Sequence, residues 1–174
     1  MRKLTMQELG RLDAGAYKKV EKLPAVIVLD NVRSLSNVGS IFRTADAFRV
    51  AEIYLCGITG TPPHREIHKT ALGATESVKW SYWKHTSEAI SHLKNKGYSI
   101  AAVEQTDESI FLDQFKLEQP TALVFGNEVE GVDNQIIKQC DFGIEIPQAG
   151  TKHSLNISVC TGIVLWHLFH QFKT

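Results

Sequence analysis

Short apolar runs rich in β-branched residues alternate with segments of helical periodicity along most of this chain. After Pro24 the apolar runs lie at 25–29, 52–55, 78–83, 98–103, 121–125 and 143–146. Segments typical of helices lie between most of them, at 38–48, 86–95, 133–139 and 155–172. Strands that alternate with helices predict an α/β fold with a mostly parallel sheet and flanking helices.

Length and charge limit what the chain can be. Its 174 residues predict one domain with a contiguous core. The charged stretch before Pro24 separates an N-terminal basic segment, 1–23, from a main domain, 24–174. Nineteen basic and nineteen acidic side chains cancel, which disfavours strong, sequence-independent binding of nucleic acid. Residues 1–22 hold six basic and three acidic side chains, an excess that fits a solvated face as well as a phosphate contact.

Cysteine usage and the N-terminal sequence indicate the compartment. Cys56, Cys140 and Cys160 lie far apart and two of them fall in apolar runs, so they predict reduced core thiols. The first residues lack the apolar run of a signal peptide, and no apolar segment reaches membrane-spanning length. We therefore expect a cytoplasmic protein without a membrane partner.

Two of the expected helices have informative patterns. The segment 38–48 carries an apolar stripe at three- and four-residue spacing, and at about 100° per residue Arg43 lies well off that stripe. Arg43 can therefore face a pocket or solvent. The last helix is apolar nearly all round, which predicts burial by the rest of the domain or by a second subunit.

Several familiar motifs fail in this chain. His64 and His68 are four residues apart, but a zinc-protease helix needs glutamate directly after the first histidine, and Arg65 stands there. No serine elbow surrounds Ser154, and no glycine-rich nucleotide loop is present. We expect no metal site and no nucleoside triphosphate or dinucleotide site.

Three separated stretches carry polar residues where an apolar strand meets a turn or a helix begins. They are 37–43, 125–128 and 154–158. Open α/β sheets bind ligands at such strand ends. These stretches therefore predict one site, provided that the fold brings them together.

Four motifs, in the same order along the chain, resemble the signatures of the SpoU family of RNA ribose 2′-O-methyltransferases. They are LDN at 29–31 with NVGSIFRTADAF at 37–48, KTALGA at 69–74, LVFGNEVEG at 123–131, and IPQAGTKHSLNIS at 146–158. The likeness runs from about Ala25 to the C-terminus. Four motifs in register are far more specific than any one of them.

The resemblance implies a SPOUT-type fold whose C-terminal part forms a deep trefoil knot, and an obligate homodimer. It also implies S-adenosylmethionine as the cofactor, held by the knotted loops. The implied reaction is methyl transfer to a ribose 2′-hydroxyl of transfer RNA or ribosomal RNA. Because the 174 residues include no large appended RNA-binding domain, transfer RNA, a compact target, is slightly favoured.

Cofactor binding is expected at the ends of several strands. Gly126 has no Cβ and would let backbone approach a ligand closely, although an ordinary turn explains Gly126 and Asn127 equally well. By resemblance, the cofactor also contacts Val103 and Glu104. An apolar wall and backbone groups that can bind the adenine edge would come from Ile146, Pro147, Gln148, Ser154 and Leu155.

Arg43 is the residue expected at the chemistry, because the family uses the matching arginine to act on the 2′-hydroxyl. A guanidinium keeps its proton to above about pH 12, so Arg43 is either a costly neutral base or a donor that orients the hydroxyl and the adjacent phosphate. Asn37 would fix Arg43 or the ribose, or would simply be a helix N-cap. Glu128, Ser154 and Asn156 are expected to bond the arginine, the RNA backbone or the knot loops, and Ser154 could also be merely a cap.

The chain departs from the family pattern at four points. Many members have a proline-containing approach to the first motif where this chain has Leu35-Ser36. They commonly have a glycine in place of Arg49, a methionine in place of Gln148 and an alanine in place of Cys160. None of these changes removes a residue assigned to chemistry, so we expect activity to be kept. The alternative is a non-catalytic RNA-binding or assembly protein that retains the fold, which the zero net charge favours and the intact site residues disfavour.

Overall fold

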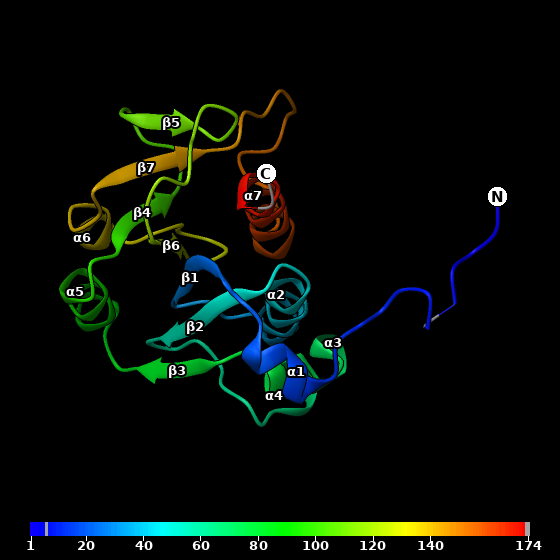
Figure 1. Cartoon of the computed structure of the whole chain (residues 1–174). Helices are drawn as coiled ribbons and strands as arrows, with labels where there is room; N and C mark the ends of the chain where they lie inside the picture. The colour runs from blue at the N-terminus through cyan, green and yellow to red at the C-terminus, as the bar shows by residue number, and fades with distance from the viewer. Residues whose placement is uncertain (6, 173–174) are drawn as a thin grey trace.

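The computed structural model describes residues 1–5 and 7–172 and contains one seven-stranded sheet (Figure 1). The strand order is β3-β2-β1-β6-β4-β7-β5, and every neighbouring pair is parallel. The predicted α/β fold with a mostly parallel sheet is therefore confirmed. The strands are β1 (Leu23–Asp30), β2 (Val50–Cys56), β3 (Trp80–Trp83), β4 (Ser99–Val103), β5 (Ser109–Phe111), β6 (Thr121–Phe125) and β7 (Phe142–Glu145).

Helices cover both faces of the sheet, with α5 and α6 on one face and α2 and α7 on the other (Figure 1). The short helices α1, α3 and α4 gather beside α2 on the second face. The seven helices of the described chain are α1 (Ala14–Lys19), α2 (Leu35–Ala47), α3 (Arg65–Ala71), α4 (Ala74–Ser77), α5 (Thr86–Asn95), α6 (Asn134–Ile137) and α7 (Ile157–Phe172).

The central strand β1 shows why two cores form. Ala25, Ile27 and Leu29 belong to the core beneath α2 and α7, whereas Val26 and Val28 belong to the core beneath α5 and α6. Successive side chains of a strand point to opposite faces. A strand covered on both faces therefore reads as an unbroken apolar run, as 25–29 does.

The stripe expected on the first helix is confirmed, and the beginning of that helix is corrected. Val38, Ile41, Phe42 and Ala45 are fully buried. However, α2 begins at Leu35 and not at 38, because the side chain of Ser34 accepts a hydrogen bond from the Asn37 N–H and caps the helix. The alternative of Asn37 as the N-cap is therefore wrong.

The N-terminal segment is partly joined to the main domain. Tyr17 of α1 is buried in the core beneath α2 and α7, and its hydroxyl donates to the Ala45 carbonyl oxygen. The boundary after residue 23 stays a prediction, as does the trefoil knot. None of the helices in 1–5 and 7–172 combines the length and the apolar character needed to cross a lipid bilayer.

Candidate functional site

A pocket of about 610 Å³ opens at the carboxyl ends of β4, β6 and β7. It is lined by residues in the segments 103–105, 125–132, 144–148 and 153–157. Parallel strands end at the same edge of a sheet, so segments far apart in the sequence meet there. Eight of the nine residues expected at the cofactor site line this pocket: Val103, Glu104, Gly126, Asn127, Ile146, Gln148, Ser154 and Leu155. Pro147 does not belong to the lining.

The segment after β6 forms a tight loop that shapes one wall of the pocket. The backbone N–H groups of Asn127 and Gly131 each donate to the other's carbonyl oxygen at 2.9 Å. A Cβ on Gly126 would lie 2.0 Å from the Gly131 carbonyl carbon and 2.1 Å from the Val132 nitrogen. The close approach that Gly126 permits is therefore to the chain's own backbone, and the loop can close only because the residue is glycine.

Glu128 connects this loop to the beginning of α2. Its carboxylate accepts hydrogen bonds from the N–H groups of Arg33 and Ser34, both at 3.0 Å, and from the Asn37 side-chain amide at 3.1 Å. Partial burial opposes ionisation of the carboxyl, but these bonds outweigh it and hold its pKa below the usual value. Glu128 therefore stays ionised and fixes the loop before α2.

The cluster continues to the third polar stretch. Asn156 donates from its side-chain nitrogen to Asn37 Oδ1 at 3.2 Å. Its own Oδ1 accepts a hydrogen bond from the Ser158 N–H at 3.0 Å. Asn156 directly precedes α7, which is the position of a capping residue. Asn156 is therefore the helix cap, and the alternative that Ser154 is the cap is wrong. Ser154 is exposed and lines the pocket.

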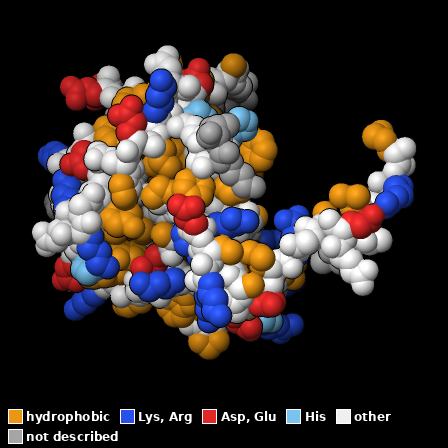
Figure 2. All heavy atoms as spheres, viewed as in Figure 1, with side chains coloured by type: hydrophobic (Ala, Val, Ile, Leu, Met, Phe, Trp, Pro, Cys, Tyr) orange, Lys and Arg blue, Asp and Glu red, His pale blue; other side chains and the backbone are white. Residues whose placement is uncertain are grey.

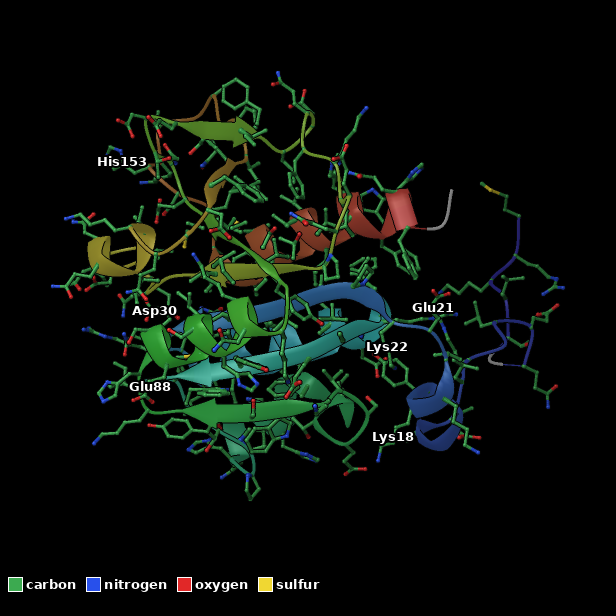
Figure 3. The ribbon with its side chains drawn as sticks, turned by 60° about the vertical axis from the view of Figure 1, so that its left-hand side comes forward. Lys18, Glu21, Lys22, Asp30, Glu88 and His153 are labelled. Atoms are coloured by element: carbon green, nitrogen blue, oxygen red, sulfur yellow. The ribbon has the colours of Figure 1, made fainter. Side chains whose placement is uncertain are left out.

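Hydrogen bonds connect the end of β1 to the loop after β6. Asp30 accepts hydrogen bonds from the Thr86 hydroxyl at 2.5 Å and the Asn31 side chain at 2.9 Å. The Asn31 carbonyl oxygen in turn accepts from the Asn127 side chain at 2.9 Å. Figure 3 shows Asp30 and His153 on the same side of the molecule, where the strands end.

Two further contacts of the pocket had no signal in the sequence. Glu104 accepts from the N–H groups of Gln105 at 2.9 Å and Val132 at 3.1 Å, so it ties the end of β4 to the loop after β6. Gln105 donates from its side chain to the His153 carbonyl oxygen at 2.8 Å. These partners are separated by up to 48 residues, and no local pattern links them.

The thiol of Cys160 lines the same pocket. Burial raises its pKa to about 11, and the nearby Glu104 carboxylate adds to this effect. The thiol is therefore a neutral part of the wall at physiological pH. Within the described residues all three cysteines are free, with Cys56 buried and Cys140 and Cys160 half-buried.

Arg43 lies apart from the pocket lining. It is exposed on α2, six residues beyond Asn37, which is a rise of about 9 Å along the helix. Among residues 1–5 and 7–172 its guanidinium makes no hydrogen bond or ion pair. Its five donors are therefore free to bind an anion or a hydroxyl.

The histidine pair at 64 and 68 has a simpler explanation than a metal. His64 Nδ1 accepts from the Glu66 N–H at 3.2 Å and caps α3. No group of three or more potential metal ligands gathers in the part of the chain that the structure describes. His64 is thus explained by the helix that it begins.

Comparison with known proteins gives a consistent result. The model of the SpoU rRNA Methylase family matches residues 24–166. The tRNA (guanosine(18)-2′-O)-methyltransferase of Aquifex aeolicus is 34% identical over 171 residues, which cover 95% of this chain and 77% of that protein. A protein of Staphylococcus haemolyticus named as a TrmH family tRNA/rRNA methyltransferase is 30% identical over 90% of this chain. The chain spans only 62% of the length of that relative.

Solved structures agree in fold. The A. aeolicus TrmH/SpoU tRNA modifying enzyme superposes with a TM-score of 0.80 at 30% identity, over 90% of this chain and 79% of that chain. The AdoMet-bound rRNA methyltransferase of Sinorhizobium meliloti gives a TM-score of 0.80 at 26% identity, over 90% of this chain and 62% of that chain. Because the family model matches residues 24–166, most of this chain, the chain belongs to the SpoU rRNA Methylase family.

Proposed function

We propose that the protein is an S-adenosylmethionine-dependent methyltransferase that modifies a ribose 2′-hydroxyl of transfer RNA or ribosomal RNA in the cytoplasm. The observation that carries this proposal is the cluster of Asn37, Glu128 and Asn156, which bonds the wall of the pocket to the helix that bears Arg43. The A. aeolicus relative, a tRNA (guanosine(18)-2′-O)-methyltransferase, supports transfer RNA and the 2′-hydroxyl as the target.

The pocket fits S-adenosylmethionine in size and in charge. Its volume of about 610 Å³ lies within the range of about 300–1,000 Å³ that small-molecule sites occupy. Ile144, Ile146 and Leu155 give an apolar wall, and Glu104 and Glu130 place carboxylates near a cationic ligand. When bound, S-adenosylmethionine supplies a methyl group that its positive sulfur makes electrophilic.

The protein's own residues then position the substrate. Arg43 orients the 2′-hydroxyl and the adjacent phosphate through its N–H donors, because a guanidinium gives up its proton only above about pH 12. Asn37, fixed on both sides by Glu128 and Asn156, holds the ribose edge or the first turns of α2. Such fixed donors and acceptors align the reacting atoms and so supply much of the rate.

A second copy of the chain is expected to cover α7. Val159, Ile163 and Trp166, spaced four and three residues apart, are 51%, 38% and 59% exposed, so they form one apolar face in solvent. The Trp166 ring also lies 6.2 Å from the Phe48 ring of α2. The sequence left open whether the domain or a partner buries this helix; the domain buries only its inner face, which favours the homodimer.

Two measurements test the proposal. Calorimetry should show binding of S-adenosylmethionine, and radioactive methyl transfer to unfractionated RNA should map to 2′-hydroxyl groups. Arg43→Ala should abolish transfer and leave cofactor affinity within about twofold, because Arg43 lies outside the pocket lining. Arg43→Lys, which keeps one charge but loses the donor fork, should retain only a small part of the activity. RNA binding without any cofactor binding would instead establish the non-catalytic alternative.

A further inference from the structure

Residues 1–5 and 7–12 form an arm that leaves the body of the protein. Figures 1 and 2 show it projecting from the side that carries α1. Within the described residues of the arm, 1–5 and 7–12, every hydrogen bond has both partners in the arm itself. The arm therefore has no partner on its own body that holds it in place.

The arm nevertheless starts from a fixed point. The Lys22 ammonium donates to the Tyr17 carbonyl oxygen at 2.6 Å and lies 3.1 Å from the centre of the Tyr17 ring, and the Tyr17 side chain is buried. Asp13 caps α1 through the Ala16 N–H at 2.8 Å. Lys18 and Lys22 mark this region in Figure 3. The direction in which the arm leaves is thus set by packing on the body.

The arm has an ordered turn of its own. Glu8 accepts hydrogen bonds from the Thr5 N–H at 2.8 Å and from both terminal nitrogens of Arg2, at 2.6 and 2.9 Å. The bonds from Arg2, and then those from Thr5, lower the pKa of the Glu8 carboxyl to about 2. Glu8 therefore stays ionised across the physiological range, and the turn that it accepts bonds from carries exposed leucines.

Those leucines indicate the chemistry of the partner. Leu4, Leu9 and Leu12 are 58%, 39% and 44% exposed, and Figure 2 shows hydrophobic side chains along the arm with no body surface beside them. The charge of the arm is a poor match for RNA, since Arg2 is already paired with Glu8 and only Lys3 and Arg11 remain. An apolar protein surface fits the leucines better than a polyanion does.

A second copy of this chain is the partner that area favours. A stable interface buries about 800 Å² on each partner and involves about 20–30 residues a side, whereas the exposed apolar face of α7 consists of Val159, Ile163 and Trp166. The arm holds the further exposed leucines.

We propose that the arm, residues 1–12, packs on the body of a second copy and extends the interface centred on α7. In a two-fold dimer each chain both gives and receives an arm, so the contact forms twice. This inference rests on the homodimer of the proposed function. It adds that the leucines of the arm supply apolar area that α7 alone lacks.

Two variants of the arm distinguish a second copy of the chain from RNA as the partner. Leu4→Ser/Leu9→Ser/Leu12→Ser removes apolar surface and keeps every charge, whereas Lys3→Gln/Arg11→Gln removes two charges and keeps the leucines. Sedimentation equilibrium should show at least a tenfold higher dimer dissociation constant for the leucine variant and no more than a twofold change for the charge variant. Deletion of residues 1–12 should match the leucine variant, with circular dichroism and cofactor affinity unchanged.

Each other outcome overturns the inference. A leucine variant that dimerises like the wild type shows that the arm is not part of the interface, while the homodimer itself stands. If only the charge variant weakens a complex, and that complex is with unfractionated transfer RNA, the arm serves RNA instead. A wild-type chain that is monomeric at every concentration removes the homodimer and the arm contact together, while cofactor binding and methyl transfer still test the enzyme separately.

Discussion

Replacing Gly126 with alanine tests whether the loop after β6 must close on itself. The added Cβ would lie 2.0 Å from the Gly131 carbonyl carbon, whereas carbon atoms need about 3.5 Å, so the backbone at Gly131 has to retreat by about 1.5 Å. That movement breaks the two backbone hydrogen bonds between Asn127 and Gly131. At about 1 kcal/mol each, their loss lowers the free energy of unfolding by about 2 kcal/mol, or about 4–8 °C in Tm for a chain of this size.

The same movement displaces a wall of the pocket, so affinity for S-adenosylmethionine should fall by at least about tenfold, which is about 1.4 kcal/mol. The control is Gly150→Ala, in the nearby loop, where a Cβ has no neighbour within 4 Å. Thermal unfolding and calorimetry of both variants provide the comparison. A Gly126→Ala protein with the Tm and the affinity of Gly150→Ala would refute the packing argument.

Three further changes have defined outcomes. Glu128→Gln should lower the free energy of unfolding at pH 7 by only about 1 kcal/mol, since solvent weakens the bonds of an exposed carboxylate. Because the pKa of Glu128 is lowered in the folded protein, the Tm difference from wild type should be full above about pH 4.5 and should shrink as the pH falls through the lowered pKa. A constant Tm difference down to pH 3 would contradict this. Trp166→Asp should give monomers by light scattering at concentrations where the wild type is a dimer, because it puts a charge into the apolar face of α7; an unchanged mass would exclude that face as the interface. Alkylation of Cys160 by iodoacetamide, followed by mass spectrometry, should accelerate up to about pH 11, because partial burial raises the pKa of the thiol. It should slow when S-adenosylmethionine is added, because Cys160 lines the pocket. A rate that levels off below about pH 9 would show an ordinary thiol.

The parts of the fold that local pattern determines were predictable. The apolar runs located six of the seven strands, because a strand covered on both faces has a continuous apolar sequence. The strand β5 was missed, since it has three residues, and its Ile110 and Phe111 lie exposed at the edge of the sheet. Helices α1, α3 and α4 were all missed. In α3 only Ile67 and Ala71 of the seven residues are buried, too few to form a stripe.

Part of the pocket lining was predictable, because parallel strands end together and two of the three polar stretches lie there. Asn37 and Arg43 lie outside the lining, and the catalytic roles assigned to them stay predictions. Which side chain caps which helix was not determined, since Ser34 and Asn37 are both good caps and only the backbone distinguishes them. The tie between Glu104 and Val132 depends on how β4 and the loop after β6 meet in space, and nothing local encodes that.

The zero net charge, which counted against an RNA partner, does not describe the pocket, whose lining is acidic. Four glutamates, Glu104, Glu128, Glu130 and Glu145, line the pocket, and among the described residues no lysine or arginine does. This lining attracts a cationic cofactor and repels phosphates, so an RNA backbone cannot follow the cofactor into the pocket. Arg33, in the loop before α2, and Arg43, on α2, are exposed and lie outside the pocket lining. Under the proposed function, the acidic lining therefore keeps RNA phosphates outside the pocket, where the free donors of Arg43 can bind them.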